Sequence, residues 1–252
     1  MGSQQHTNSD TPMFKSTTLR MICAPLMASL AWLAEAQAQH VDVSLRLIEE
    51  HPPSQSDTHP RHLTPAVAWL KPVGDQTLPF PAHSSYVLLQ KNRMFTPHIL
   101  VVPVGSVVLF PNADPFFHNV FSLFDGKRFD LGLYEAGSTK EVTFSREGLS
   151  YIFCNIHPEM SAVVISLSTP LYAIAASDGQ IKLRDIPPGE YELHIWVEGE
   201  MLPVLDKLTR RVHVGSSELS LGDIVLPTSP NLGDKHLNKF GKPYDQSEKP
   251  VY

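Results

Sequence analysis

Hydrophobic and polar residues alternate along several short stretches of the chain, beginning with residues 41–48. In this stretch, VDVSLRLI, every second side chain is apolar, which is the pattern of a half-buried β-strand. Residues 66–70, AVAWL, predict a second strand, which Pro72 and Gly74 close. Residues 51–64 are rich in Pro, Ser and His and predict a loop between the two strands.

A dense series of short strands is predicted between residues 85 and 167. The expected strands share β-branched and aromatic residues and are separated by turn residues; they are 86–89, 99–102, 107–110, 119–123, 141–144, 151–153 and 162–167. Short strands at this spacing predict a β-sandwich or barrel. The sequence predicts no helix beyond the N-terminal apolar segment, and it contains no internal repeat.

A different unit begins after Thr169-Pro170. Its expected strands also lie between turn signals; they are 171–176, 181–183, 191–197, 211–214 and 218–225. Residues 228–252 are rich in Pro, Lys, Asn and Asp and show no periodicity. This last segment is therefore predicted to be a mobile tail.

The N-terminal segment has the pattern of an export signal. Lys15 and Arg20 precede an apolar run from Met21 to Ala34, and a small-x-small site ends at Ala38. The run is shorter than the ~20 residues that a membrane span needs. We therefore expect residues 1–38 to be a cleaved signal peptide and the mature protein to be periplasmic. A retained anchor is the alternative.

Composition narrows the class of protein. Hydrophobic residues make up 42% of the 252 positions and charged residues 18%, so a folded globular chain is expected rather than a disordered one. The formal net charge is −6, which argues against binding to nucleic acid because phosphates require a basic surface. Stable insertion into a membrane is not expected either.

Of the two cysteines, Cys23 and Cys154, only Cys154 is expected to remain in the mature protein. Cleavage after Ala38 removes Cys23 and leaves one thiol in an oxidising compartment, where it has no partner for an intrachain disulfide. A metal ion is one way to occupy such a thiol. An inert, buried cysteine is the alternative.

A thiolate, an imidazole and a thioether lie within seven residues of each other. The segment Cys154-Asn155-Ile156-His157-Pro158-Glu159-Met160 directly follows a predicted strand. Thiolate and thioether favour Cu(I), and imidazole suits both oxidation states of copper. A His₂Cys site with a weak axial Met needs a second imidazole, and His118 is the best candidate. Alternatively, His118 is structural and Met160 fills the core.

These residues resemble a known family. The spacing C-x2-H-x2-M with an upstream His-Asn resembles the blue copper cupredoxins, amicyanin among them. Residues 91–98, 102–105, 110–114 and 154–157 are more similar still to the periplasmic cupredoxin-like proteins often called methylamine utilization proteins. The resemblance covers residues 85–167. It implies a cupredoxin Greek-key β-sandwich and one type 1 copper ion held by His118, Cys154, His157 and Met160. It also implies that Asn119 braces the cysteine loop.

The flanking segments resemble another module. Asp178-Gly179 and the later Pro187-Pro188-Gly189 are similar to the second half of a carboxypeptidase-regulatory-like β-sandwich. The expected fold is therefore all-β, with residues 40–82 and 169–226 forming one small sandwich. The cupredoxin domain, residues 85–167, is inserted between these two parts.

Further residues have two interpretations each. Pro115, Phe116, Phe117 and Pro158 form either an apolar docking patch around His157 or part of the core. The remaining loop histidines are expected on the solvated surface rather than in a second metal site; they are His40, His51, His59, His62, His83 and His98.

The function expected from this resemblance is that of an exported one-electron carrier. The common catalytic motifs, such as G-x-S-x-G, H-E-x-x-H and the P-loop, do not occur in the sequence, so an enzyme is not expected. The partner would be a periplasmic redox protein that the sequence does not name. The alternative is a protein for copper binding or delivery, or a non-catalytic binding module with a cupredoxin fold.

Overall fold

A computed structural model of the chain shows an all-β protein, which confirms the expected fold class. The structure describes residues 40–49, 64–74, 78–81, 85–123, 126–226, 238–240 and 242. The expected signal peptide, the loop histidines His51, His59, His62 and His83, and most of the expected tail lie outside these residues. In the described part of the chain, no helix has the length and hydropathy needed to cross a membrane.

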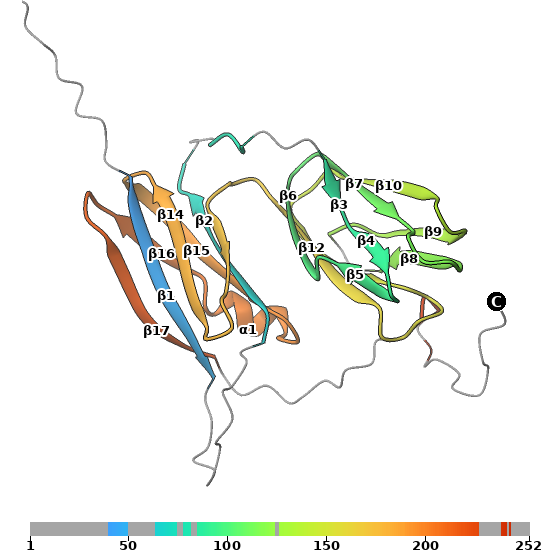
Figure 1. Cartoon of the computed structure of the whole chain (residues 1–252). Helices are drawn as coiled ribbons and strands as arrows, with labels where there is room; N and C mark the ends of the chain where they lie inside the picture. The colour runs from blue at the N-terminus through green and yellow to red at the C-terminus, as the bar shows by residue number, and fades with distance from the viewer. Residues whose placement is uncertain are drawn as a thin grey trace, which may run out of the picture. The chain divides into compact units, whose positions relative to one another are not determined.

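Two sheets are built from strands at the two ends of the described chain (Figure 1). The first has the order β14 (Gln180–Ile186), β1 (Val41–Glu49) and β17 (Leu219–Leu226). The second has the order β13 (Tyr172–Ile174), β2 (Ala66–Pro72), β15 (Gly189–Val197) and β16 (Arg210–Val214). Strand β1 runs antiparallel to β14 and parallel to β17. The segment before residue 73 therefore pairs with the segment after residue 171.

The intervening residues form their own sheets. The larger has five strands in the order β6 (Ile99–Pro103), β12 (Ser161–Leu167), β11 (Gly148–Phe153), β8 (His118–Ser122) and β9 (Phe129–Tyr134). A smaller one has the order β10 (Thr139–Phe144), β7 (Ser106–Pro111) and β3 (Tyr86–Val87). Strands β4 (Leu89–Lys91) and β5 (Met94–Thr96) form a hairpin. A hydrophobic core lies between the larger and the smaller sheet, with Val108 and Phe110 packed in one cluster with Val120 and Ile152.

Strand β12 is buried on both faces. Ala162 and Val164 belong to the core of the intervening sheets, whereas Val163 and Ile165 pack into a cluster with residues of β1, β2 and β15. Side chains of a strand alternate between its two faces, so burial of both faces requires an uninterrupted apolar run. This is why the segment 162–167 shows no polar alternation, apart from the buried Ser166.

The larger sheet therefore packs against the sheet that contains β2 and β15. Trp196 is fully buried there, and its Nε1–H donates a hydrogen bond to the hydroxyl of Tyr151 at 3.0 Å. The predicted division into a sandwich of residues 40–82 and 169–226 with an inserted domain stays a prediction. Each sheet contains strands from only one of the two predicted units. However, a single hydrophobic cluster contains residues of both units.

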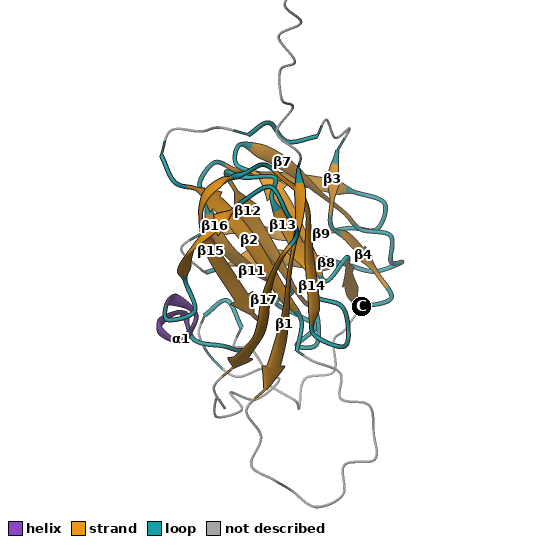
Figure 2. Ribbon diagram, turned by 90° about the vertical axis from the view of Figure 1, so that its left-hand side faces the viewer, coloured by secondary structure: helices purple, strands orange, loops and turns teal. Residues whose placement is uncertain are grey.

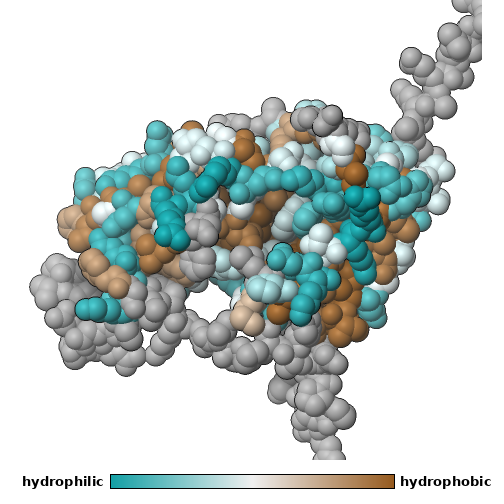
Figure 3. All heavy atoms as spheres, turned by 180° about the vertical axis from the view of Figure 1, so that it is seen from behind, coloured by the Kyte–Doolittle hydropathy of each residue, from teal (hydrophilic) through white to brown (hydrophobic). Residues whose placement is uncertain are grey.

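The sequence analysis missed three short elements. Helix α1 (Leu202–Asp206) is a single turn with a proline in its first turn (Figure 2), too short to show helical periodicity. Strand β9 contains Gly132 with φ 67°, and glycine there resembles a turn signal. Strand β5 has three residues and depends on its hairpin partner β4. On the face shown in Figure 3, hydrophobic and hydrophilic residues are intermixed.

Substitutions of Trp196 test the packing between the five-stranded sheet and the sheet that contains β2 and β15. We expect Trp196→Ala to lower the free energy of unfolding by about 3–5 kcal/mol, because it leaves a large cavity. Trp196→Phe keeps one six-membered ring but loses the hydrogen bond and leaves a smaller cavity, so it should cost about 1–3 kcal/mol. Urea unfolding of the three proteins measures both values. Equal stability of Trp196→Ala and wild type would contradict the described packing.

The pair His98–Glu198 is a second contact between these two groups of strands, and its contribution to stability depends on pH. His98 Nε2 lies 2.8 Å from Glu198 Oε1, and this hydrogen bond raises the pKa of His98 despite the opposing effect of burial. The pair therefore stabilises the fold fully below the unfolded-state pKa of about 6.5, and the contribution disappears as pH rises through the folded-state pKa.

Because both side chains are partly exposed, we expect the pair to contribute about 0.5–1 kcal/mol. Urea unfolding of wild type and Glu198→Gln should differ by this amount at pH 5.5 and by clearly less at pH 9. A difference that stays constant between these pH values would show that protonated His98 is not the source.

Candidate metal centre

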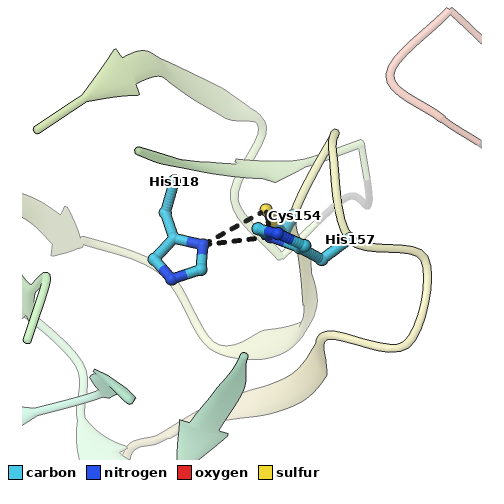
Figure 4. A group of neighbouring side chains, drawn as sticks. All are labelled: His118, Cys154 and His157. Atoms are coloured by element: carbon cyan, nitrogen blue, oxygen red, sulfur yellow. Dashed lines mark hydrogen bonds between the residues drawn. The ribbon is translucent and has the colours of Figure 1, made fainter. Parts of the chain in front are cut away.

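Three buried side chains point toward one another at one end of the larger sheet (Figure 4). The Nδ1 atoms of His118 and His157 lie 3.2 Å apart. Cys154 Sγ lies 3.8 Å from the Nδ1 of His118 and 3.5 Å from that of His157. His118 and Cys154 are fully buried, and His157 is only 3% exposed. One nitrogen or sulfur atom from each residue therefore converges on a common point.

Neighbouring strands place these residues. His118 is the first residue of β8, and Cys154 follows the last residue of β11. The two strands pair antiparallel with Phe153 opposite Phe121, so the start of one lies near the end of the other. The loop after Cys154 is closed by main-chain hydrogen bonds, from Met160 N–H to His157 C=O at 3.0 Å and from Cys154 N–H to Met160 C=O at 3.3 Å. This closure directs His157 back toward Cys154.

Asp114 orients the ring of His118. Its Oδ2 accepts a hydrogen bond from His118 Nε2–H at 2.8 Å. An ionised carboxylate only accepts hydrogen bonds, so the ring proton is held on Nε2. The lone pair of Nδ1 is thereby left facing Cys154 and His157. Such a carboxylate behind a histidine is a common arrangement around bound metal ions.

The carboxylate of Asp114 is itself held by the tip of the β4–β5 hairpin. The N–H groups of Asn92 and Arg93 donate to Oδ1 and Oδ2 at 2.6 and 2.9 Å. Burial alone would raise the pKa of Asp114, but the hydrogen bonds from Arg93, His118 and Asn92 together lower it. Both Asn92 and Arg93 have φ 56°, as a tight two-residue hairpin requires. The sequence analysis missed Asp114, although its spacing of four residues from His118 was a usable signal.

Burial also sets the protonation of the other two residues. It raises the pKa of the Cys154 thiol, although main-chain N–H groups of Asn119, Ile156 and His157 donate to the sulfur and partly oppose this effect. Burial and then the nearby His118 lower the pKa of His157 to about 4. The imidazole of His157 is therefore neutral at neutral pH, which is the form that binds metal ions.

The three atoms fit a single transition-metal ion. With metal–nitrogen and metal–sulfur bonds of about 2.0–2.3 Å, three ligands around one ion in a plane are roughly 3.5 Å apart. The observed separations of 3.2, 3.5 and 3.8 Å match that value. Two imidazoles and a thiolate in a closed, buried pocket are a donor set for copper or zinc.

The remaining predicted site residues have mixed outcomes. Met160 is fully buried at the end of the same loop, and its role as a ligand stays a prediction. The side chain of Asn119 donates to Asp130 Oδ1 at 2.7 Å, so it is not the side chain of Asn119 that contacts the cysteine loop. Its main-chain N–H reaches Cys154 Sγ instead.

The surface around His157 is partly apolar. Pro115 is exposed, Phe117 is 52% exposed and Pro158 is half-buried. Phe116 is half-buried and packs on both imidazoles, with ring centroids 5.2 Å from His118 and 5.7 Å from His157. Phe116 thus covers the centre, whereas its neighbours face solvent.

A second metal site is not found in the part of the chain that the structure describes. His118, Cys154 and His157 form the one group with metal-ligand spacing there. His98 is engaged with Glu198 and with the carbonyl oxygen of Ser161, and His40 is exposed. For these two histidines, the structure agrees with the expected surface position.

The chain matches no known protein-family profile and no curated protein sequence. Among solved structures, it is similar to a purple cupredoxin from Nitrosopumilus maritimus, with 24% identity over 33% of this chain and 100% of that chain and a TM-score of 0.30. It is also similar to an oxidised proline-to-alanine mutant of amicyanin, with 21% identity over 34% of this chain and 86% of that chain and a TM-score of 0.32.

A copper-containing nitrite reductase from Thermus scotoductus SA-01 is a third similar structure. The identity is 22%, the match covers 39% of this chain and 26% of that chain, and the TM-score is 0.33. These similarities extend over only part of the present chain. The interpretation of the centre therefore depends on its own geometry.

Asp114 provides a test of this geometry that does not involve redox chemistry. We expect Asp114→Asn to weaken binding of Co(II) by about 10–100-fold, since the amide no longer fixes the proton on His118 Nε2. Glu159→Gln is the matched control, because it also removes a negative charge near the loop but no hydrogen bond to a histidine. Competition titrations followed by the thiolate-to-cobalt absorption give both affinities. Equal losses in the two variants would show that only charge matters.

Proposed function

We propose that this protein is a copper-binding one-electron carrier. The observation that carries the proposal is the convergence of two imidazole nitrogens and one thiol sulfur within 3.8 Å of one another in a buried pocket. His₂Cys sites of this kind with a weak axial methionine are those of blue-copper electron-transfer proteins. His118, Cys154 and His157 would hold the ion, and Met160 would be the fourth, weaker ligand.

Copper bound at this centre would supply one-electron chemistry by changing between Cu(II) and Cu(I). The surrounding residues support such a role by fixing the ligands before the ion arrives. His118 is held by Asp114, and the sulfur of Cys154 accepts three main-chain N–H groups. Because these contacts do not involve the metal, they can keep the ligands in place in both oxidation states.

A redox partner would dock next to His157. Pro115 and Phe117 flank Phe116, which packs on His157, and both are exposed. Pro158, the residue after His157, is half-buried. Together they would form an apolar surface close to this ligand. Exposed apolar patches of this kind mark interaction sites. A periplasmic location, a cleaved signal peptide and a relationship to methylamine utilization proteins belong to this proposal and rest on the sequence alone.

Copper loading tests the proposal directly. We expect one equivalent of Cu(II) to produce an intense visible thiolate-to-copper absorption and a narrow copper hyperfine splitting in the EPR spectrum. Cys154→Ser should abolish the band, because it removes the only proposed sulfur donor to copper with thiolate character. In the uncleaved chain, Cys23→Ser is the matched control and should keep the band. Persistence of the band in Cys154→Ser would refute the assignment.

The same loaded protein separates electron transfer from copper delivery. A carrier cycles reversibly between Cu(II) and Cu(I) in voltammetry and keeps its ion. A delivery protein holds one oxidation state and releases copper to an acceptor. Reversible cycling without copper loss supports the carrier, whereas release of the ion on reduction would favour the delivery alternative.

A further inference from the structure

A short C-terminal turn contacts the residue that follows Cys154. The main-chain N–H of Lys239 donates to Asn155 Oδ1 at 3.0 Å, and its ammonium group donates to Asp130 Oδ2 at 2.7 Å. Asn238 stabilises the turn, since its Oδ1 accepts the N–H groups of Phe240 and Lys242 at 2.9 and 3.0 Å. These residues belong to the segment 228–252, which the sequence analysis predicts to be a mobile tail, and that description of the segment stays a prediction.

The contacts of Lys239 are part of a closed ring of hydrogen bonds. Asp130 accepts from the side chain of Asn119 at 2.7 Å, and the main-chain N–H of Asn119 donates to Cys154 Sγ. The peptide bond from Cys154 to Asn155 closes the ring. Asn119 directly follows His118 in the chain, so the ring joins the two segments that carry the candidate ligands.

Two features distinguish this ring of hydrogen bonds from a single ion pair on the surface. The side chains of Lys239 and Asp130 are 27% and 39% exposed, and a single ion pair of that kind contributes little to stability. However, Lys239 binds through its main chain and its side chain at once, and Asp130 also accepts the N–H of Gly132 at 2.9 Å. Several bonds therefore restrain the same few atoms.

We propose that Lys239 is a positioning residue for the cysteine loop. By bridging Asn155 and Asp130, it holds the loop against strand β9 and keeps the Asn119 N–H directed at the sulfur of Cys154. Loss of the bridge lets the loop open locally, and a loop that opens more often exposes its buried thiol more often. The inference deepens the proposed function and depends on it only for the retention of copper.

Reactivity of the Cys154 thiol in metal-free protein tests the bridge without any metal. In a Cys23→Ser background, Cys154 is the sole thiol. We expect Lys239→Met to react with Ellman's reagent about three- to tenfold faster than the parent, the change that loss of one such hydrogen bond produces. Both variants keep the main-chain N–H to Asn155, but only Lys239→Arg keeps a cation for Asp130, so Lys239→Arg should stay near the parental rate. Lys242→Met, on the same turn, is the matched control.

A second variant addresses the main-chain contact. Asn155→Ala removes the acceptor of the Lys239 N–H and should accelerate the reaction to a similar extent. Urea midpoints show whether each variant is folded as the parent is. Equal rates for Lys239→Met and Lys242→Met would overturn the proposal, and so would unchanged rates in both Lys239→Met and Asn155→Ala.

Copper loading separates the two proposals. If the thiol is exposed faster in Lys239→Met and loaded copper also passes faster to a chelator, the bridge positions a copper ligand. If the wild-type protein forms no thiolate-to-copper band but the thiol rates still differ as expected, the proposed function fails and the bridge stands. If the band forms and the thiol rates do not differ, the bridge fails and the proposed function stands.

Discussion

Packing of strands β11 and β12 on both faces of the five-stranded sheet is the constraint on which the rest of the structure depends. Strands β11 and β12 contribute alternate side chains to two different cores, so neither strand can shift by one residue without exchanging its buried faces. The loop between them carries Cys154, His157 and Met160. A rigid pair of strands thus fixes both ends of the loop, and seven residues have little freedom left.

Burial of the three candidate ligands lowers the stability of the fold unless other contacts compensate for it. Two imidazole nitrogens and a thiol sulfur face one another away from water, and moving polar atoms out of water costs free energy that their hydrogen bonds must offset. Main-chain N–H groups around Cys154 and the carboxylate behind His118 stabilise these groups in part. A bound cation would accept the lone pairs that converge on one point, so the arrangement of these three residues favours metal binding.

Much of this could be read from the sequence because the signals are local. Alternation predicted β1, continuous apolar runs predicted β2 and β12, and the spacing of Cys154, His157 and Met160 within one loop indicated a ligand set. The parts that escaped are contacts between distant segments. The spacing of Asp114 and His118 was a local signal for their pair. The bonds from Asn92 and Arg93 that hold Asp114 join segments distant in the chain, and no local pattern predicts them. Likewise, a polar tail of low periodicity gave no sign that Lys239 reaches Asn155.

These two contacts between distant segments both restrain the centre. Asp114 restrains His118 from one side of the centre, and Lys239 restrains the segment next to Cys154 from another. Each acts through a residue that contacts or neighbours a ligand, and neither depends on a metal being present. A protein that only hands its ion on gains from a pocket that opens easily, whereas an electron carrier gains from ligands that do not move when the charge changes. Restraint from several sides, supplied by segments more than a hundred residues apart in the chain, is the arrangement that the second requirement favours.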